Sequence, residues 1–398
     1  MKNYQNLEKT KWPRCIVLQL SLSMSAVWGT GIFQLRIGVR RPMLTIWTQT
    51  YNDEKYIGQC IESVLKQSYP DFEYIIVDDG STDDTWAVIE DYARKDPRIR
   101  AFHHTSRAGG IRYNLMLDTI HGEYFAVLDS DDWLERDFLA HLVGFCKTDN
   151  LDMCVCGTQS FDEATGERNI LRNSDAKLSF TFAETPYYFR LIHSFLRPVW
   201  GKLIRTEVLR KADLSVFQRF MEQKYKGFDT AFTIGLFESS QRIGVLNQCL
   251  HNYRVRENSS FSAFSETRYD AYEELHEQSI KLLSRFGPIS SENQEFMSMV
   301  FFNAVKDALD ICIRSPLPEP EKLTYVASIL GKPKVLELRK EDTGEGLELL
   351  VPYVAWFILR ANTIEVHRKE FSNLLKFIQP KLLNPISDSE WDALLDAY

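Results

Sequence analysis

Apolar and polar positions follow a regular order from Met43 to about residue 130. A short apolar or β-branched run is followed each time by a polar turn, and then by apolar residues at helical spacing. Ser81 is expected to cap the second helix, with Asp83 and Asp84 in its first turn. The predicted elements are strand 44–48, helix 57–65, strand 74–77, a helix after Ser81, strand 99–102, helix 111–119 and strand 124–128. This alternation predicts a largely parallel sheet covered by helices on both faces, with ligands at the carboxyl ends of the strands.

The pattern becomes mainly helical after about residue 260. Apolar positions keep helical spacing over residues 269–283 and 296–313. A dense apolar run at 349–359 is too short to cross a bilayer. Core packing is the first interpretation of this run, and docking on a membrane surface or a partner is the second. We therefore expect an α/β domain over residues 43–260 and a helical C-terminal region over residues 261–398.

Residues 1–42 fit neither pattern. The stretch from Cys15 to Leu35 has no charged side chain and about the length of a membrane span, but polar residues and glycines interrupt it. Three interpretations stay open: a signal-anchor helix, a cleaved signal peptide, or upstream sequence outside the working protein. We favour the last, with translation beginning at Met43, because this methionine directly precedes the first expected strand.

Composition restricts the class of protein. A chain of 398 residues with 44% hydrophobic side chains can bury one large core or two unequal ones. The net charge of -8 and the lack of a basic stretch argue against nucleic acid as a partner. The seven cysteines are odd in number and scattered, which is typical of reduced thiols in the cytoplasm. Cys154 and Cys156 are expected on one face of a buried strand, in preference to a zinc site.

Acidic residues follow two of the expected strands. Asp78 and Asp79 follow the second strand, and Asp129, Asp131 and Asp132 follow the fourth. Like charges at one edge of a sheet repel one another, and a divalent cation or several hydrogen-bond donors relieve that repulsion. A D-x-D sequence alone is also typical of a solvated turn that caps a helix. It is the expected shared edge that indicates a common ligand.

The assembled motifs resemble the family 2 glycosyltransferases, which have the GT-A fold. The matching segments are LTIWTQTYNDEKYIGQCIESVLKQSYPDFEYIIVDDGSTDDT, HGEYFAVLDSDDWLERDFL, WGKL and HNYRVRENSSFS, in that order. The resemblance implies a Rossmann-like mixed sheet of the nucleotide-diphospho-sugar transferase type. It also implies that residues 43–260 are the catalytic domain.

The resemblance assigns candidate donor-binding residues. Thr50, Tyr51 and Asp79 would hold the base and ribose of the nucleotide, and Gly80 would let the backbone approach the ligand closely. A carboxylate suits this role because it accepts hydrogen bonds from a uracil N–H or a ribose hydroxyl.

The remaining candidates would bind the diphosphate, the metal ion or the sugar. In relatives the D-x-D segment binds Mn²⁺ or Mg²⁺, here through Asp129, Asp131 and Asp132, with Asp129 also facing the donor. Two arginines before that segment face the diphosphate or are simply solvated, and one tryptophan stacks on a sugar or fills the core. These three residues are Arg107, Arg112 and Trp200.

An inverting transfer also needs a general base. Family members place it in a Glu-Asp pair at the start of a helix. This chain has GFDTAF at that point, so Asp229 matches the Asp and Phe228 replaces the Glu. A helix cap is the alternative role of Asp229. The segment from His251 through Arg254, Arg256, Ser259 and Ser260 closes over the diphosphate in relatives, and is otherwise a solvated basic turn.

The resulting expectation is transfer of a sugar from a UDP-sugar to a hydroxyl of a glycan or lipid-linked acceptor, with inversion. Relatives build surface polysaccharides, so a cytoplasmic protein on the inner face of a membrane fits. A processive synthase is disfavoured because its usual Q-x-x-R-W segment is absent. A sugar-nucleotide pyrophosphorylase would need a Gly-rich basic N-terminal loop, which is also absent. A catalytically inactive nucleotide-sugar-binding or scaffold relative stays open because of Phe228.

Overall fold

The structure is a computed structural model that describes residues 43–108, 110–256, 263–335, 337, 349–350 and 352–354. The expectations for residues 1–42, for most of the 349–359 run and for Ser259 and Ser260 concern parts of the chain outside these residues. None of the described helices is long and apolar enough to cross a membrane.

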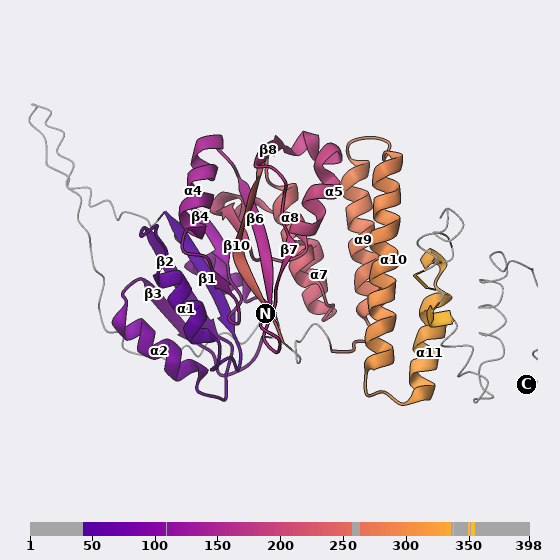
Figure 1. Cartoon of the computed structure of the whole chain (residues 1–398), viewed down its shortest axis with the longest axis horizontal. Helices are drawn as coiled ribbons and strands as arrows, with labels where there is room; N and C mark the ends of the chain where they lie inside the picture. Colours follow the sequence, from indigo (N-terminus) through magenta and orange to yellow (C-terminus); the bar gives the residue numbers. More distant parts are fainter. Residues whose placement is uncertain are drawn as a thin grey trace, which may run out of the picture.

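The first half of the chain alternates strands and helices, as the pattern predicts (Figure 1). The elements are β1 (Leu44–Thr50), α1 (Ile57–Leu65), β2 (Phe72–Asp78), α2 (Thr85–Lys95), β3 (Ile99–His103), α3 (Tyr113–Thr119) and β4 (Tyr124–Val127). The next elements are β5 (Trp133–Leu134), α4 (Phe138–Asp149), β6 (Met153–Asp162), β7 (Arg168–Arg172), β8 (Leu178–Thr181), η1 (Phe182–Glu184) and α5 (Thr185–Leu196). Then come β9 (Lys202–Arg205), α6 (Thr206–Lys211), α7 (Ser215–Glu222), α8 (Phe228–Glu238) and β10 (Arg242–Val255).

The strands of the described residues join one ten-stranded sheet with the order β3-β2-β1-β4-β9-β6-β10-β5, in which β7 pairs with β6 and β8 with β10. Strands β1 to β4 are parallel, whereas β9 runs antiparallel to β4 and to β6. The expected mixed α/β sheet is therefore confirmed.

The strand register brings the acidic sequences to one edge of the sheet. Thr50, the last residue of β1, pairs with Asp78, the last residue of β2. In the same sheet Trp47 pairs with Val127, so the residues after β4 leave the sheet beside the end of β1. Parallel pairing of β1 with both neighbours thus places all three carboxyl ends together.

The two faces of the sheet pack against separate cores. Because side chains alternate along a strand, Trp47 joins one core while Ile46 joins the other. Helices α1 and α4 cover the second face, and Cys154 and Cys156 are buried with them, as expected for one face of a strand. Helices α5, α7 and α8 cover the first face.

The start of α2 differs from the prediction. Ser81 does not cap the helix, which begins at Thr85, so Asp83 and Asp84 precede its first turn. The Ser81 hydroxyl instead donates to Asp78 Oδ1 at 2.5 Å, and Asp83 Oδ1 accepts from the Thr85 N–H at 3.1 Å. Because the buried Asp78 carboxylate accepts from the Ser81 hydroxyl, Asp83 and not Ser81 accepts from the first N–H of the helix.

The helices after residue 263 are α9 (Arg268–Ser284), α10 (Ser291–Arg314) and α11 (Glu319–Leu330), which confirms the two helices expected there. They stand side by side away from β1 to β3, with α10 next to α5, α9 next to α8, and α11 on the far side of α10 (Figure 1). Leu282 and Met297 join the core that α5 and α8 build. The division at residue 260 stays a prediction, since apolar contacts cross it.

Candidate active site

Backbone contacts join the ends of β1 and β2. The Asp79 N–H donates to the Thr50 carbonyl at 2.8 Å, and Thr50 is 3% exposed. Gly80 follows with φ +87°, and a Cβ at this position would lie 3.1 Å from the Ser106 nitrogen. Only glycine therefore allows this conformation and this close approach of the 104–108 loop.

The buried Asp79 carboxylate forms an ion pair with the half-buried Arg112. Asp79 Oδ1 accepts from Arg112 Nε at 2.6 Å, and Asp79 Oδ2 accepts from the Ala108 N–H at 2.7 Å. The Arg112 N–H is also fixed, because it donates to Gln49 Oε1 on β1 at 3.0 Å. Two residues predicted to bind the nucleotide thus contact each other.

Arg107 and Tyr51 form a second contact at this edge. The Arg107 guanidinium lies 4.3 Å from the centre of the Tyr51 ring. Tyr51 is half-buried and Arg107 is exposed. A cation over an aromatic face leaves the other surfaces of both groups open to a ligand.

The D-S-D-D loop between β4 and β5 gathers three carboxylates. Ligand oxygens of Asp129, Asp131 and Asp132 all lie within 4.8 Å of one another. Burial and the neighbouring carboxylates raise the pKa of Asp129 and of Asp132 well above the usual range. Burial also raises the pKa of Asp131. The protein therefore holds a concentration of negative charge that costs free energy unless a cation offsets it.

These carboxylates fit a divalent cation. Asp132 is 1% exposed, and its Oδ2 has no hydrogen-bond partner among the residues that the structure describes. Carboxylate oxygens are the ligands that Mg²⁺ and Mn²⁺ prefer. A buried acceptor without a donor, next to two further carboxylates, is the chemistry expected of a ligand set for such an ion.

Asp53 and Arg256 lie beside the three carboxylates, and the sequence analysis did not identify Asp53 as a site residue. Arg256 Nη2 lies 2.5 Å from Asp131 Oδ2, and Arg256 Nη1 lies 3.0 Å from Asp53 Oδ1. Asp53 Oδ2 accepts from the Ser130 hydroxyl at 2.5 Å. The available signal was the position of Asp53 in the turn directly after β1, at the same sheet edge.

Asp229 lies in the first turn of α8, beside the acidic cluster. Burial raises its pKa to about 6, and the Lys202 ammonium partly offsets this rise. The charge of Asp229 in turn raises the pKa of Asp129, so the two carboxylates interact electrostatically.

Lys202, from the WGKL sequence, is a further buried charge that the sequence did not single out. It is 2% exposed, and its Nζ donates to the carbonyls of Pro198 at 2.5 Å and Trp200 at 3.1 Å. Burial holds the pKa of Lys202 well below its usual range.

Trp200 is packed inside the protein at 7% exposure. Its ring stacks on His251 with centroids 4.3 Å apart and planes 6° apart. His251 is fully buried, and its Nε2 lies 3.3 Å from Asp132 Oδ2. Trp200 therefore supports the acidic loop through His251, and sugar stacking by Trp200 stays a prediction.

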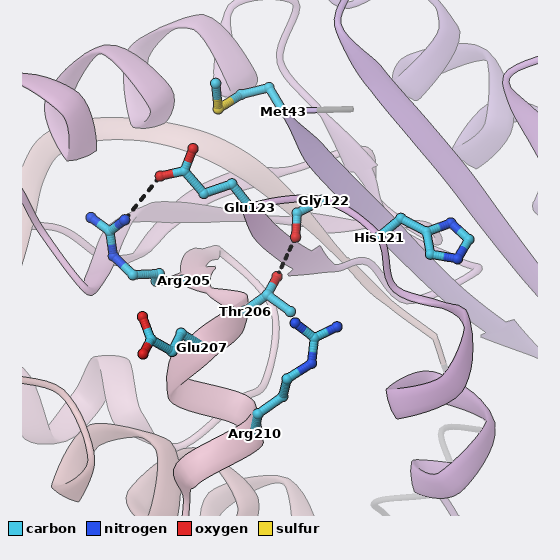
Figure 2. Close-up of a pocket in the computed structure, with 8 residues that line it drawn as sticks. All are labelled: Met43, His121, Gly122, Glu123, Arg205, Thr206, Glu207 and Arg210. Atoms are coloured by element: carbon cyan, nitrogen blue, oxygen red, sulfur yellow. Dashed lines mark hydrogen bonds and ion pairs between the residues drawn. The ribbon is translucent and has the colours of Figure 1, made fainter. Parts of the chain in front are cut away.

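A separate cavity of about 370 Å³ lies at the amino edge of the sheet, near the starts of β1 and β4. Glu123 pairs there with Arg205 at 2.9 Å, and the Thr206 hydroxyl donates to the Gly122 carbonyl at 2.7 Å (Figure 2). The lining residues are Met43, His121, Gly122, Glu123, Arg205, Thr206, Glu207 and Arg210. None of the predicted site residues lines this cavity.

Part of the chain matches a known protein family. Residues 45–212 match the family model described as glycosyl transferase family 2. The uncharacterized glycosyltransferase EpsJ of Bacillus subtilis is 30% identical over 224 residues, which are 55% of this chain and 62% of EpsJ. The poly(ribitol-phosphate) β-N-acetylglucosaminyltransferase TarS of Staphylococcus aureus is 26% identical over 239 residues, which are 59% of this chain and 39% of TarS. The chain thus spans less than two thirds of either relative.

A solved structure agrees with the fold. The crystal structure of S. aureus TarS 1–349 in complex with UDP-GlcNAc superposes with a TM-score of 0.51 at 19% identity, covering 74% of this chain and 83% of that one. At this level of identity the likeness concerns the fold. The match over residues 45–212, the mixed sheet and this likeness support a family 2 glycosyltransferase with the GT-A fold.

Proposed function

We propose that the protein transfers a sugar from a UDP-sugar to a hydroxyl of a glycan or lipid-linked acceptor, with inversion. The observation that carries the proposal is the group of half-buried and buried carboxylates at the carboxyl edge of the sheet. Asp129, Asp131 and Asp132 lie together there, and Asp229 lies beside them. Ligands of open α/β sheets bind at this edge.

The donor class is supported by relatives. TarS, 26% identical over the aligned residues, is named as an N-acetylglucosaminyltransferase and has been solved with UDP-GlcNAc. A chondroitin synthase from Escherichia coli is 34% identical over 134 residues, which are 34% of this chain and 19% of that protein. These names favour a UDP-sugar donor and a role in surface polysaccharide synthesis. A lipid-linked acceptor would place the reaction at the inner face of a membrane.

We assign nucleotide binding to the side of the site where Thr50, at the end of β1, and Gly80, after β2, lie. Asp79 is held rigidly by Arg112 and the Ala108 N–H, so its remaining lone pairs have fixed directions. A fixed carboxylate discriminates well between ligands, because a ligand without a matching donor leaves it unpaired. Tyr51 and Arg107 offer an aromatic face and a positive charge at the same edge.

Asp129, Asp131 and Asp132 would hold Mn²⁺ or Mg²⁺. When bound, such an ion offsets the charge that develops on the diphosphate leaving group. The three carboxylates would hold that ion, and the Arg254 N–H fixes Asp132 by donating to its Oδ1 at 2.8 Å. His251, stacked on Trp200, restricts the position of Asp132 from the other side.

Asp229 would act as the general base. In its ionised form it accepts the proton of the acceptor hydroxyl, whose oxygen attacks the anomeric carbon as the bond to the diphosphate breaks. A pKa of about 6 leaves it largely ionised at neutral pH while making it a stronger base than an exposed aspartate. Lys202 nearby stabilises the ionised form.

The test is UDP release from a panel of UDP-sugars with Mn²⁺, for wild-type protein and for Asp131→Ala and Asp229→Asn. We expect turnover of one donor, its loss in Asp131→Ala, and loss of acceptor-dependent turnover in Asp229→Asn by about 10²- to 10⁴-fold. Asp137→Ala is the matched control, because Asp137 lies just before α4, outside the carboxylate cluster.

The inactive-relative alternative predicts a different result. It is favoured by Phe228, which packs against the hydrophobic core in place of the acid found in relatives. An inactive relative would bind UDP in a manner that depends on Asp131, but would release no UDP from any donor with any acceptor. Failure to bind UDP at all would contradict both functions.

A further inference from the structure

Arg256 is held between two carboxylates that come from different loops. Its Nη2 lies 2.5 Å from Asp131 Oδ2 in the D-S-D-D loop, and its Nη1 lies 3.0 Å from Asp53 Oδ1 in the turn after β1. The guanidinium also lies 4.9 Å from the centre of the Tyr56 ring. The fork of an arginine can bridge two acceptors in this way, whereas a single ammonium cannot match the geometry.

The Arg256 bridge is partly shielded from water. The side chains of Arg256, Asp131 and Asp53 are 28%, 18% and 11% exposed. Asp53 is fixed in turn, because its Oδ2 accepts from the Ser130 hydroxyl and from Thr50 Oγ1. An ion pair with these surroundings is screened less by solvent than one on the open surface.

The bridge occupies part of the ligand set for a divalent cation. Asp131 is one of the three carboxylates that lie within reach of a common ion, and its Oδ2 is taken by Arg256. The neighbouring Asp132 Oδ2 has no hydrogen-bond partner within the described part of the chain. Without a divalent cation, Arg256 therefore supplies positive charge to Asp131, whereas Asp132 Oδ2 has only the His251 ring nitrogen nearby, at 3.3 Å.

We propose that Arg256 is a built-in counter-ion that competes with the divalent cation for Asp131. Loading of the ion requires the Arg256–Asp131 pair to break, while Asp53 retains the guanidinium at the rim of the site. The inference rests on the proposed metal site and adds a positioning residue that lowers metal affinity in the absence of donor. Arg256 also stabilises the acidic loop before the ion arrives.

The test measures Mn²⁺ binding by calorimetry, without donor or acceptor. Arg256→Gln removes the competitor, and we expect it to bind Mn²⁺ about tenfold more tightly than wild type, the size of a modest ion-pair energy. Lys55→Gln is the matched control. It removes one positive charge from the turn after β1, which also holds Asp53, but Lys55 pairs with Glu163 and not with Asp131. Its affinity is expected to stay within about twofold of wild type.

Two further measurements separate competition for Asp131 from a general effect of the Arg256 charge on the electrostatic potential of the metal site. Arg256→Lys keeps the charge but loses the bridge, so competition predicts an affinity between wild type and Arg256→Gln, whereas a field effect predicts the wild-type value. Metal-free Arg256→Gln should also melt at a lower temperature than metal-free wild type. Saturating Mn²⁺ should remove that difference, and a purely structural role for Arg256 would leave it unchanged.

The outcomes distinguish this inference from the proposed function. If wild type binds Mn²⁺ and Asp131→Ala does not, the metal site stands. If Arg256→Gln then binds Mn²⁺ no more tightly than Lys55→Gln does, the counter-ion role is overturned alone. If neither wild type nor Arg256→Gln binds Mn²⁺ through Asp131, both the metal site and the counter-ion role fail.

Discussion

Burial gives Asp229 a pKa of about 6, so its charge changes within the ordinary pH range. As a general base it must be ionised, and we expect turnover to fall as pH drops through about 6. The same shift has the opposite effect on stability. The native state holds the proton between the unfolded pKa, near 3.8, and 6, so ionised Asp229 destabilises the fold at neutral pH.

Asp229→Asn should therefore lower acceptor-dependent turnover and raise the melting temperature at pH 7.5. The unfolding free energy should rise by an amount on the order of 1 kcal/mol. A pH–rate profile of the wild type and thermal melts of both proteins check this. Unchanged stability together with unchanged turnover would remove Asp229 from the site.

A second prediction for single residues concerns the Asp79–Arg112 pair. Arg112→Lys keeps the charge but loses the fork that contacts Asp79, so Asp79 should lose its fixed orientation. We expect the KM for the donor and the Kd for UDP to rise about tenfold with little change in kcat. Arg98→Lys is the control, because Arg98 forks onto Asp96 before β3, at the far edge of the sheet. Equal effects of the two substitutions on UDP binding would contradict the assigned role of Arg112.

The 104–108 loop approaches the turn after β2 closely at Gly80. Gly80→Ala strains a left-handed residue and pushes its Cβ to 3.1 Å from the Ser106 nitrogen. We expect lower stability and weaker UDP binding, because the loop carries the Ala108 N–H that fixes Asp79.

Gly166→Ala is the matched control for Gly80→Ala. Gly166 has φ +75° but a Cβ there meets nothing within 4 Å. It should show the conformational cost alone, about 1–2 kcal/mol, and leave UDP binding unchanged. Stability and calorimetric titrations of both variants check this, and parallel losses of UDP binding would exclude the loop mechanism.

The packing of α5, α9 and α10 buries two histidines. Burial lowers the pKa of His193 and of His276 to about 4, and the two rings contact Phe296 and Phe301 on α10. Between pH 6.5 and 4 the unfolded chain binds more protons, so stability falls as pH falls, by at most about 1.4 kcal/mol per pH unit for each histidine. Urea unfolding at pH 7 and pH 5 should show this slope reduced in His276→Gln. An equal slope in the variant would contradict it.

At the scale of the molecule, the sequence predicted what local pattern determines. Strand and helix periods located β1 to β4, and parallel pairing then required Asp79 and Asp129 to share an edge. The antiparallel insertion of β9 between β4 and β6 was not predictable, because it depends on pairing between segments distant in sequence. The Asp53–Arg256–Asp131 bridge was missed for the same reason, since Asp53 and Arg256 are 203 positions apart. Ser81 shows the converse: a favourable cap sequence was overruled by a buried neighbour, Asp78.

We propose that this fold turns over a UDP-sugar with a cation held by the D-S-D-D carboxylates. The most direct measurement is UDP release from UDP-sugars by the wild-type protein in Mn²⁺ and in EDTA, compared with Asp131→Asn in Mn²⁺. We predict release of UDP from one donor in Mn²⁺, and loss of that release both in EDTA and in Asp131→Asn. Release that is equal in all three conditions, or absent with every donor and metal, would contradict the claim.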